Sequence, residues 1–465
     1  MKIKINNRKI TITDPTDSLL NIIKSELIYK DKAKEYQIKR LSKNPWTRNS
    51  PEIKKLQSEV NGELYKETSD SIEFSSAFYR SYEDILKNYT IEDNRHATGS
   101  TIALPWVNKP HDLRDYQKEA IDAMSANFRG TINFATGLGK TLLSAHFIKQ
   151  YKKKSLVVCP SESVAKQFYE ILENSLGKNR VSFYGSGKKK ISDITVGIAA
   201  SVSLNINEFK NIDLGLVIID EAHHTPANTF MAIADGLADV GKLFGLTATD
   251  YRSDGKDIMI TAGCGKVIAQ KDVKWGISNG WLAEPYFIIR EVDTGGKDYK
   301  EDKLKSYKEH VLNNNIMKSR IESDARSMMD AGKTVLILVD EVAHGKELSL
   351  KLDIPFATGE DKKSQSYVDD LNNGKTRGLV GTSGKIGEGS DTKNVDVLIL
   401  ADFTASKGPV IQAVGRALRK HGLKNKALVL DYIPLGSTML SRHAKNRINY
   451  YREITDKIKI LKHKT

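Results

Sequence analysis

The sequence predicts an α/β protein in which two parallel-sheet domains follow a small α+β domain at the N-terminus. From Leu113 onward, short β-branched runs alternate with helical segments, and a polar stretch at about 267–307 divides these runs into two sets. The length agrees, because at about 100–200 residues per domain the 465 residues make two to four domains. We place the boundaries at 1–97 for the accessory domain, 98–275 and 276–436 for the two α/β domains, and 437–465 for a basic helix.

Composition and charge narrow the class of protein. The chain has 72 Lys and Arg against 58 Asp and Glu, a net charge of +14, which favours nucleic acid as a polyanionic partner. A lysine-rich proteome would explain the same balance equally well. Two cysteines exclude a disulfide framework or a multi-cysteine zinc site. The N-terminus lacks the apolar segment of a signal peptide, and no apolar run approaches a membrane span, so we expect a soluble cytoplasmic protein without membrane partners.

The N-terminal segment predicts a hairpin followed by a helix. Isoleucines alternate with polar residues over 2–13 around the turn pair Asn6-Asn7, and Asp17 is placed to cap the next helix. Residues 24–55 then hold ten basic and four acidic side chains, interleaved with Tyr29, Tyr36 and Trp46. This combination is typical of phosphate contact with base stacking, and the alternative is a packing domain with the aromatic residues in its core.

A glycine-rich loop between a strand and a helix carries the first chemical signal. The strand 131–134 leads into Ala135–Thr141 (A-T-G-L-G-K-T), and a helix is predicted from Leu142. Backbone N–H groups of such a loop point at phosphates, and the helix dipole adds to their attraction. Lys140 would reach the β and γ phosphates, and the hydroxyl of Thr141 would bind Mg²⁺.

Two adjacent carboxylates end a buried strand about eighty residues later. The segment Leu214–His223 (L-G-L-V-I-I-D-E-A-H) places Asp220 and Glu221 at the carboxyl end of its strand, the edge of a parallel sheet where the loop also lies. We expect Asp220 to hold Mg²⁺ through water and Glu221 to orient and activate the attacking water. The pattern therefore predicts nucleotide hydrolysis.

The order and spacing of the motifs resemble superfamily 2 helicases and translocases of the DEAH/DExH type. The resemblance covers about residues 110–435, and the family often has A-T-G-x-G-K-T as its phosphate loop. Asp250 departs from the family, where proline often follows T-A-T. The motifs are, in chain order, Leu113–Gln117 (L-R-D-Y-Q), Ala135–Thr141, Asp220–His223 (D-E-A-H), Gly245–Thr249 (G-L-T-A-T), Gly387–Asp391 (G-E-G-S-D) and Gln412–Arg419 (Q-A-V-G-R-A-L-R).

The resemblance implies two RecA-like domains that use ATP and Mg²⁺, and it assigns further roles. Gln117 would read adenine, and Gln412, Arg416 and Arg419 would act as catalytic residues from the second domain. An arginine there can neutralise the transferring phosphate when the domains close. Nucleotide contacts would come from Thr136, Gly137, Leu138, Gly139, Lys140, Thr141, Gly389 and Asp391, and nucleic-acid contacts from Pro160, Ser161, Gln167, Ser201, His344, Thr382 and Ser383.

The C-terminal segment predicts one amphipathic helix. Apolar residues recur every three or four positions from Leu440 to Leu461, and residues 441–465 carry eight Lys or Arg against two Asp or Glu. The apolar stripe indicates a core contact, and the basic face is either solvated or a DNA contact. This segment, together with Gly415–Gly422, is similar to phage branch-migration helicases of the T4 UvsW type.

We therefore expect an ATP-dependent DNA helicase or translocase that remodels branched DNA, by fork reversal or branch migration, in phage-type replication, recombination or repair. Its partners would be forked DNA, a single-stranded tracking strand and replication or recombination proteins, in the host cytoplasm if a phage encodes it; no oligomer is implied. By elimination, residues 1–97 would recognise the branch. The alternatives are an RNA helicase, the motor subunit of a restriction or nuclease complex, and a basic DNA-binding scaffold with an inactive ATPase.

Overall fold

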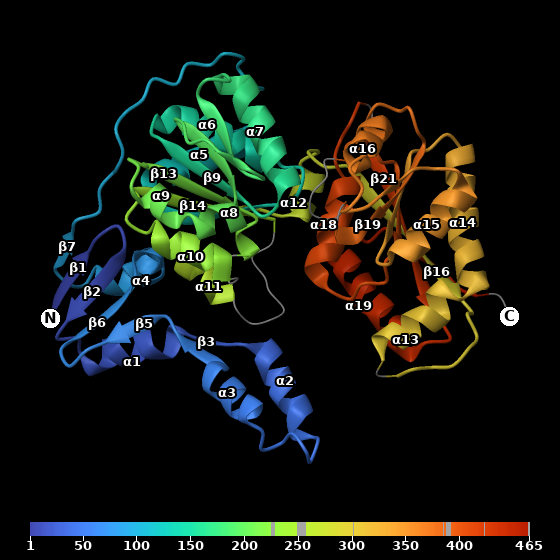
Figure 1. The fold of residues 1–465 in the computed structure, drawn as a ribbon, viewed down its shortest axis with the longest axis horizontal. Coiled ribbons are helices and arrows are strands. Elements are labelled where there is room, and N and C mark those ends of the chain that lie inside the picture. The colour runs from blue at the N-terminus through green and yellow to red at the C-terminus, as the bar shows by residue number, and fades with distance from the viewer. Residues whose placement is uncertain are drawn as a thin grey trace. The chain divides into compact units, whose positions relative to one another are not determined.

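The computed structural model describes residues 1–224, 228–248, 257–300, 302–384, 386, 392–422 and 424–463 (Figure 1). The chain forms two compact units. The first comprises Met1–Phe134 and Gly139–Gln270, and the second comprises Ala135–Leu138 and Lys271–Thr465. Among the described residues, no helix is long and apolar enough to cross a membrane.

The first unit begins with a small α+β domain. Its sheet has the order β5-β6-β2-β1-β7, in which only the β1–β7 ladder among those described is parallel. The predicted hairpin over 2–13 is confirmed, but Thr16 rather than Asp17 is the N-cap, because its hydroxyl accepts the Leu19 N–H at 3.4 Å. The elements are β1 (Lys2–Ile5), β2 (Lys9–Thr13), α1 (Asp17–Glu26), β5 (Tyr65–Glu67), β6 (Ser71–Ser75), η1 (Ser76–Phe78), α4 (Tyr79–Leu86) and β7 (Ile91–Asp93).

A helical hairpin is inserted into this domain. The strands β3 (Ile28–Lys30) and β4 (Asn61–Glu63) pair with each other apart from the main sheet, and α2 (Lys32–Ser42) and α3 (Pro51–Glu59) lie between them. Figure 1 shows both helices beyond the β3–β4 ladder and away from the five-stranded sheet. We call residues 31–60 the α2–α3 hairpin.

The small domain is fastened to the α/β part of the same unit. Ala262 of α11 (Asp257–Cys264) lies in the hydrophobic core of the small domain, and Ser75 donates to the Ala262 carbonyl at 3.0 Å. The buried guanidinium of Arg129 donates to the carbonyls of Asn7 at 2.9 Å and Val240 at 2.8 Å. Removal of the whole small domain would expose this apolar and polar contact surface.

The rest of the first unit is an α/β domain around a sheet of order β11-β10-β12-β9-β13-β14-β8-β15. The described ladders from β10 to β8 are parallel, whereas β11 runs antiparallel to β10. The strands are β8 (Arg129–Phe134), β9 (Ser155–Cys159), β10 (Val181–Gly185), β11 (Lys188–Lys189), β12 (Ile194–Ile198), β13 (Leu216–Asp220), β14 (Lys242–Thr247) and β15 (Val267–Lys271). The helices, besides α11, are α5 (Asp115–Ala126), α6 (Lys140–Tyr151), α7 (Glu162–Leu176), α8 (Ala199–Leu204), α9 (Ile206–Lys210), η2 (Ala222–His224) and α10 (Asn228–Gly236).

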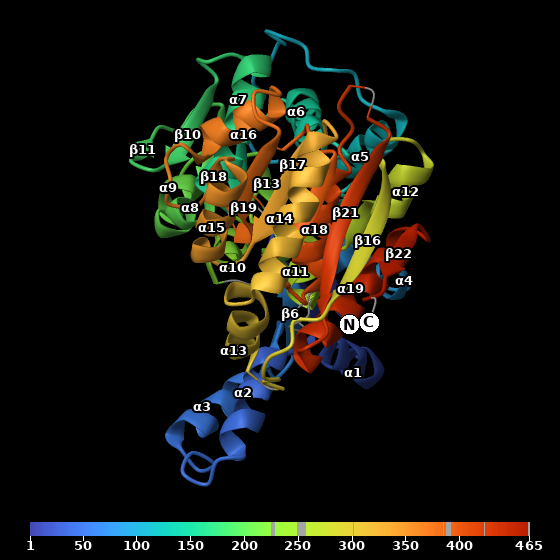
Figure 2. The ribbon, with the colours of Figure 1, turned by 90° about the vertical axis from the view of Figure 1, so that its right-hand side faces the viewer.

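The second unit is a parallel sheet of order β18-β19-β17-β20-β21-β16-β22. Figures 1 and 2 show α14 and α15 on one face of this sheet and α18 and α19 on the other. The strands are β16 (Glu284–Val292), β17 (Val335–Val339), β18 (Phe356–Ala357), β19 (Gly378–Thr382), β20 (Val397–Ala401), β21 (Lys426–Pro434) and β22 (Ile458–Leu461). The helices are α12 (Val273–Ser278), α13 (Lys303–Tyr307), η3 (Lys308–Leu312), α14 (Asn315–Asp330), α15 (Val342–Leu352), α16 (Ser364–Asn372), α18 (Lys407–Ala417) and α19 (Thr438–Ile454).

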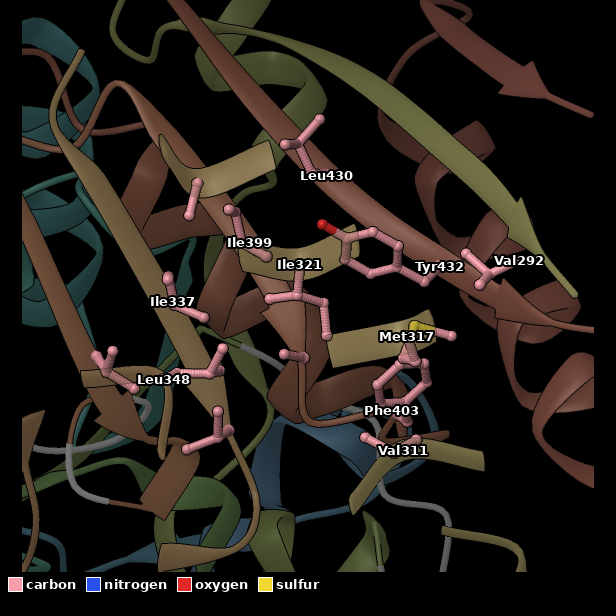
Figure 3. Packing of buried hydrophobic residues seen from close by; sticks show 14 of the residues in the cluster. Val292, Val311, Met317, Ile321, Ile337, Leu348, Ile399, Phe403, Leu430 and Tyr432 are labelled. Atoms are coloured by element: carbon pink, nitrogen blue, oxygen red, sulfur yellow. The ribbon is translucent and has the colours of Figure 1, made fainter. Parts of the chain in front are cut away.

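The core of the second unit explains why its central strands read as continuous apolar runs. Met317 and Ile321 of α14 pack on Ile337 and Ile399 of the central strands, and all four are fully buried (Figure 3). Both faces of these strands are covered by helices, as parallel sheets require. The two parallel sheets and the small domain confirm the predicted fold class.

Two predicted segments need correction. The stretch 267–307 contains the strands β15 and β16; the burial of β16 alternates along the strand, so polar side chains separate its apolar ones in the sequence. The C-terminal helix ends at Ile454, because Thr455 is extended and β22 then joins the edge of the sheet beside β16. The isoleucine spacing at the C-terminus fits both the helical and the strand period, and pairing with β16 decides between them.

Candidate nucleotide and nucleic-acid sites

The loop between β8 and α6 has the backbone of an anion site. Gly137 and Gly139 have φ of +88° and +77°, a left-handed backbone conformation that residues other than glycine rarely adopt. A Cβ at Gly139 would also lie 2.5 Å from the Gln117 Nε2 atom. The helix α6 begins directly after Gly139, so its free N–H groups and its dipole face the loop.

Side chains around the loop hold this shape. The Lys140 ammonium donates to the Phe134 carbonyl at 2.9 Å, across the base of the loop. Gln117 of α5 is fully buried; its Nε2 donates to the Gly139 carbonyl at 3.3 Å, and its Oε1 accepts the Arg114 N–H at 3.0 Å. Gln117 therefore braces the loop, and its predicted reading of adenine stays a prediction.

The remaining predicted contacts of the loop lie where the motif places them in the chain. The Leu138 N–H donates to the Ala135 carbonyl at 3.2 Å, which closes a turn that contains Thr136 and Gly137. Thr141, half-buried, is the second residue of α6. A hydroxyl in the first turn of this helix can reach a cation held beside the phosphates.

The two carboxylates lie at the carboxyl end of β13, which lies beside β14 in the sheet that also contains β8. Asp220 is the last residue of the strand. Glu221 has φ of +50°, a strained conformation for a residue other than glycine. Strain of this kind, about 1–3 kcal/mol, persists where the surrounding structure fixes it, often at functional sites. The strained residue is therefore the one that directly follows the strand-end carboxylate Asp220.

Burial and neighbouring charges shift the pKa values of Asp220 and Glu221 in opposite directions. Burial, and then the adjacent negative charge of Glu221, raise the pKa of Asp220 to about 7, against the attraction of Lys140. Burial also opposes ionisation of Glu221, but the contact with His223 and the charge of Lys140 outweigh it and lower its pKa to about 2. Glu221 is thus the carboxylate that stays ionised.

His223 links Glu221 to the neighbouring strand, which sequence reasoning did not predict. Its Nδ1 lies 3.3 Å from Glu221 Oε2 and 3.3 Å from the hydroxyl of Thr247 at the end of β14. The signal was present in the D-E-A-H and G-L-T-A-T motifs, but only the pairing of β13 with β14 shows that the two motifs meet. Thr249 and Asp250 lie outside the described residues.

The donor set fits a magnesium nucleotide. Magnesium prefers hard oxygen ligands, and the Thr141 hydroxyl and Asp220 carboxylate supply them. Asp220 is in no ion pair among the described residues, and burial, followed by the charge of Glu221, disfavours its ionised form, which a bound divalent cation would stabilise. The loop N–H groups and Lys140 complement a polyphosphate.

The predicted arginines belong to the second unit. Gln412 and Arg416 are buried on α18, whereas Arg419 lies beyond the end of that helix and is half-buried. The Arg419 N–H donates to the Arg416 carbonyl at 3.2 Å, and its backbone forms a bridge with Leu282. The Q-x-x-G-R-x-x-R motif therefore spans a helix and the residues that follow it. Its first arginine is buried on the helix, and its second is half-buried beyond the helix end.

Candidate nucleic-acid contacts of the first unit lie at strand ends. Ser161, after Pro160 and the end of β9, caps α7 by accepting the Val164 N–H at 3.5 Å. Gln167 lies on α7, and Ser201 lies half-buried on α8. The capping bond uses a lone pair of the Ser161 oxygen, so the hydroxyl can still donate its proton, either to the Ser163 hydroxyl 3.1 Å away or to a phosphate oxygen. The predicted contacts of these residues stay predictions.

Candidate contacts of the second unit are partly corrected. Thr382 ends β19, and the next hydroxyl, that of Ser383, donates to Asp402 Oδ2 at 2.7 Å. His344 is only 1% exposed, packed in α15 with its Nδ1 3.4 Å from the Tyr307 hydroxyl, and burial lowers its pKa to about 4. A neutral, buried ring does not reach a phosphate, so the interpretation of His344 as a nucleic-acid contact is corrected. Gly389 and Asp391 lie outside the described residues.

Two parallel sheets, a phosphate loop and a carboxylate pair define the class: the chain resembles superfamily 2 helicases of the DEAH/DExH type. Residues 110–252 match the family described as "Type III restriction enzyme, res subunit". IRC3 of Saccharomyces cerevisiae is 27% identical over 365 residues, which are 70% of this chain and 52% of IRC3. The ATP-dependent DNA helicase uvsW of Enterobacteria phage T4 is 26% identical over 352 residues, 70% of this chain and 69% of that protein.

Other comparisons agree with the fold. Rad25 of Halobacterium salinarum is 27% identical over 78% of this chain and 60% of its own length, so the chain spans about half to six-tenths of IRC3 and Rad25. The DNA-bound Type ISP restriction-modification enzyme LlaBIII has a TM-score of 0.58 at 16% identity, over 82% of this chain and 34% of that chain. An RNA-bound Dbp5 variant of Saccharomyces cerevisiae has a TM-score of 0.55 at 14% identity, over 75% of this chain and 89% of that one.

Proposed function

We propose that this chain is an ATP-dependent DNA helicase or translocase that remodels branched DNA. The observation that carries the ATPase part is the strained Glu221, directly after Asp220, in the same unit as Gly139, Lys140 and Thr141 of the phosphate loop. The similarity to phage uvsW, named as an ATP-dependent DNA helicase, supports DNA as the substrate. The net charge of +14 supports a polyanion.

Each residue of the first site has a distinct task in the proposed hydrolysis. Lys140 exchanges its bond to the Phe134 carbonyl for oxygens of the β and γ phosphates. Glu221, ionised and fixed by its strained backbone, orients a water and accepts its proton. His223 keeps that carboxylate in place through its contacts with Glu221 and Thr247. When bound, Mg²⁺ near Thr141 and Asp220 would neutralise phosphate charge.

The second unit contributes cations to the proposed reaction. Arg416 and Arg419 are the candidates to neutralise charge that develops on the transferred phosphate, and Gln412 is the candidate to position that phosphate. The strand-end residues Pro160, Ser161, Gln167, Ser201, Thr382 and Ser383 are the candidate phosphate contacts on DNA. Such contacts position a strand without reading its sequence.

Two other functions share these features. An RNA helicase would hold its substrate through the same phosphate contacts, and the RNA-bound Dbp5 variant has a similar fold. A restriction motor would act together with a nuclease, and LlaBIII, a restriction-modification enzyme, has a similar fold as well. Branched DNA is preferred because the chain carries a further domain, residues 1–97, with an exposed basic and aromatic hairpin.

The test compares ATP hydrolysis and unwinding with single strands, duplexes, forks and four-way junctions, each made of DNA and of RNA. We expect DNA to stimulate hydrolysis and forks or junctions to be processed faster than linear duplex. Affinity should fall steeply with salt, because log K falls with a slope of about −0.9 per phosphate contact on duplex DNA. Stimulation by RNA alone, or equal rates on branched and linear DNA, would contradict the proposal.

A further inference from the structure

The α2–α3 hairpin is an insert that contributes almost nothing to the core of its domain. Lys30 and Asn61 pair directly across the β3–β4 ladder, so the chain leaves and re-enters the ladder at adjacent positions. The helix α2 has no buried residue, and in α3 only Ile53 is buried. Packing in the domain core therefore does not account for these thirty residues, and their exposed surface suggests a different role.

The tip of this hairpin presents Trp46 to solvent on a hydrogen-bonded loop. The Trp46 side chain is 93% exposed, although tryptophan is normally well buried. The Asn44 Oδ1 atom accepts the Trp46 N–H at 3.0 Å, and Thr47 donates its hydroxyl to the Leu41 carbonyl at 2.7 Å. Pro45 adds a fixed φ to the same turn. The indole is therefore held out on an ordered turn.

The ion-paired carboxylates of the hairpin, Glu35 and Glu59, lie in the halves of α2 and α3 that adjoin the β3–β4 ladder. At the base, Glu35 pairs with Lys30 at 3.2 Å and with Lys39 at 3.0 Å, and Glu59 pairs with Lys34 at 2.8 Å. Near the tip, Arg40, Lys43 and Arg48 are exposed and take part in no ion pair within the described part of the chain. Exposed cations without an ion pair in the described part of the chain therefore flank Trp46 in the sequence.

The other aromatic residues of the region are placed differently. Tyr29 lies against Gly62 on the facing strand, where a Cβ would meet the tyrosine ring at 2.3 Å, so it belongs to the β3–β4 ladder. Tyr36 is 71% exposed but lies on the body of α2, within the paired base. Only Trp46 combines full exposure, an ordered turn and flanking cations.

We propose that the tip of the α2–α3 hairpin is a branch-point wedge, in which Trp46 stacks on an exposed base at a DNA junction and Arg40, Lys43 and Arg48 contact the flanking phosphates. Indole stacking with neighbouring cations is the chemistry that binds unpaired bases without sequence preference. Uninterrupted duplex offers no exposed base face, so such a tip distinguishes a junction from linear DNA. This inference rests on the proposed function, because it names the part of the chain that recognises the branch.

The first experiment measures binding of a fluorescent four-way junction and of the matched linear duplex to the full chain without nucleotide. Trp46→Ala should weaken junction binding about 5- to 150-fold, as expected for one stacked base, and leave duplex binding within about twofold. Trp46→Phe should restore most of the loss. A 2-aminopurine at the branch point should change its fluorescence with the wild type and not with Trp46→Ala.

Matched charge changes locate the contact along the hairpin. Lys43→Gln with Arg48→Gln removes two tip charges, and Lys54→Gln with Lys55→Gln removes two exposed charges from α3. The tip pair should weaken junction binding and flatten its salt dependence more than the α3 pair. Equal losses from both pairs would overturn the proposal, because they would indicate only a diffuse electrostatic effect.

Excision provides a second, independent variant. Joining Lys30 to Asn61 by Asn-Gly replaces the hairpin with a two-residue turn that suits antiparallel strands. The variant should keep DNA-stimulated ATP hydrolysis and lose its preference for junctions over duplex. If the excision variant and the Trp46→Ala variant each retain the preference for junctions, the proposed wedge is wrong. The proposed ATPase and helicase function would not be affected by that result. A wild type without DNA-stimulated hydrolysis overturns the proposed function itself.

Discussion

The two parallel sheets of this protein each contain a buried aspartate, and the surroundings of these two carboxylates differ. In the first unit, Asp220 ends β13 without an ion pair among the described residues, and its pKa is raised to about 7. In the second unit, Asp431 within β21 is fully buried and receives the Arg447 guanidinium at 2.7 and 2.8 Å and the Tyr451 hydroxyl at 2.8 Å. One carboxylate is left for a ligand, and the other is satisfied by the protein.

The strand-end residue of β20 repeats the contrast. Asp402 is buried and accepts the Ser383 hydroxyl at 2.7 Å, and burial raises its pKa. Asp402 is thus satisfied by a side chain of its own unit, as Asp431 is, whereas Asp220 belongs to the unit that holds Gly139, Lys140 and Thr141. The comparison teaches that a carboxylate at a strand end acts on a ligand only where the fold leaves it uncompensated beside an anion-binding loop.

The largest effect should come from the cations of the second unit. Arg416→Ala and Arg419→Ala should each leave nucleotide binding nearly intact and slow hydrolysis about 10³–10⁵-fold, as arginines do when they stabilise phosphoryl transfer. Single-turnover hydrolysis at saturating ATP measures this. Rates within tenfold of wild type for both variants would confine the chemistry to the first unit.

A smaller but still large loss is expected at the carboxylate that stays ionised. Glu221→Gln should lower hydrolysis about 10²–10⁴-fold and keep ATP binding, because only the proton acceptor is lost. Lys140→Ala should lose hydrolysis together with nucleotide affinity. Asp402→Asn, the matched strand-end change in the second sheet, should hydrolyse ATP without DNA at close to the wild-type rate. If Asp402→Asn and Glu221→Gln lose equal activity, the contrast between the sheets fails.

The satisfied carboxylate should respond in stability rather than in chemistry. Arg447→Met removes the partner of a fully buried Asp431 and should destabilise the second unit by about 3–5 kcal/mol. Urea unfolding measures the change. A double change of Arg447→Met with Asp431→Leu should recover much of the loss, because it removes the unpaired charge as well. No recovery would show that the loss comes from packing and not from the ion pair.

Replacement of Asp220 should stabilise the protein, whereas Arg447→Met should destabilise it. Asp220 has a pKa of about 7 in the folded protein and about 3.9 when unfolded, so the folded state holds more protons between these values. Stability therefore falls as pH rises through about 4 to 7. Asp220→Asn should stabilise the first unit by about 2–4 kcal/mol at pH 8, with the gain disappearing below about pH 4. Thermal unfolding at the two pH values checks this, and a pH-independent difference would contradict it.

The sequence could predict the site to the extent that it depends on local order along the chain. The loop Ala135–Thr141 and the pair Asp220–Glu221 were found because a strand, a short motif and a helix follow one another. His344 was misread because a histidine after a strand has the same local pattern whether it is exposed or buried. The contact of His223 with Thr247 was missed because it joins two motifs through the pairing of neighbouring strands.

Hydrophobic periodicity and motif spacing by themselves determined the fold class, the two α/β units and the residues of the phosphate loop, because these features depend on neighbours within a few positions. Tertiary structure alone decided three other matters. It fixed which carboxylates remain uncompensated, since Arg447 reaches Asp431 from sixteen residues away through packing of α19 on β21. It made 458–461 a strand, because β16 offers an open edge. It left Trp46 at a solvent-exposed tip, because none of the elements that the structure describes packs on it; exposure depends on tertiary packing and not on local sequence.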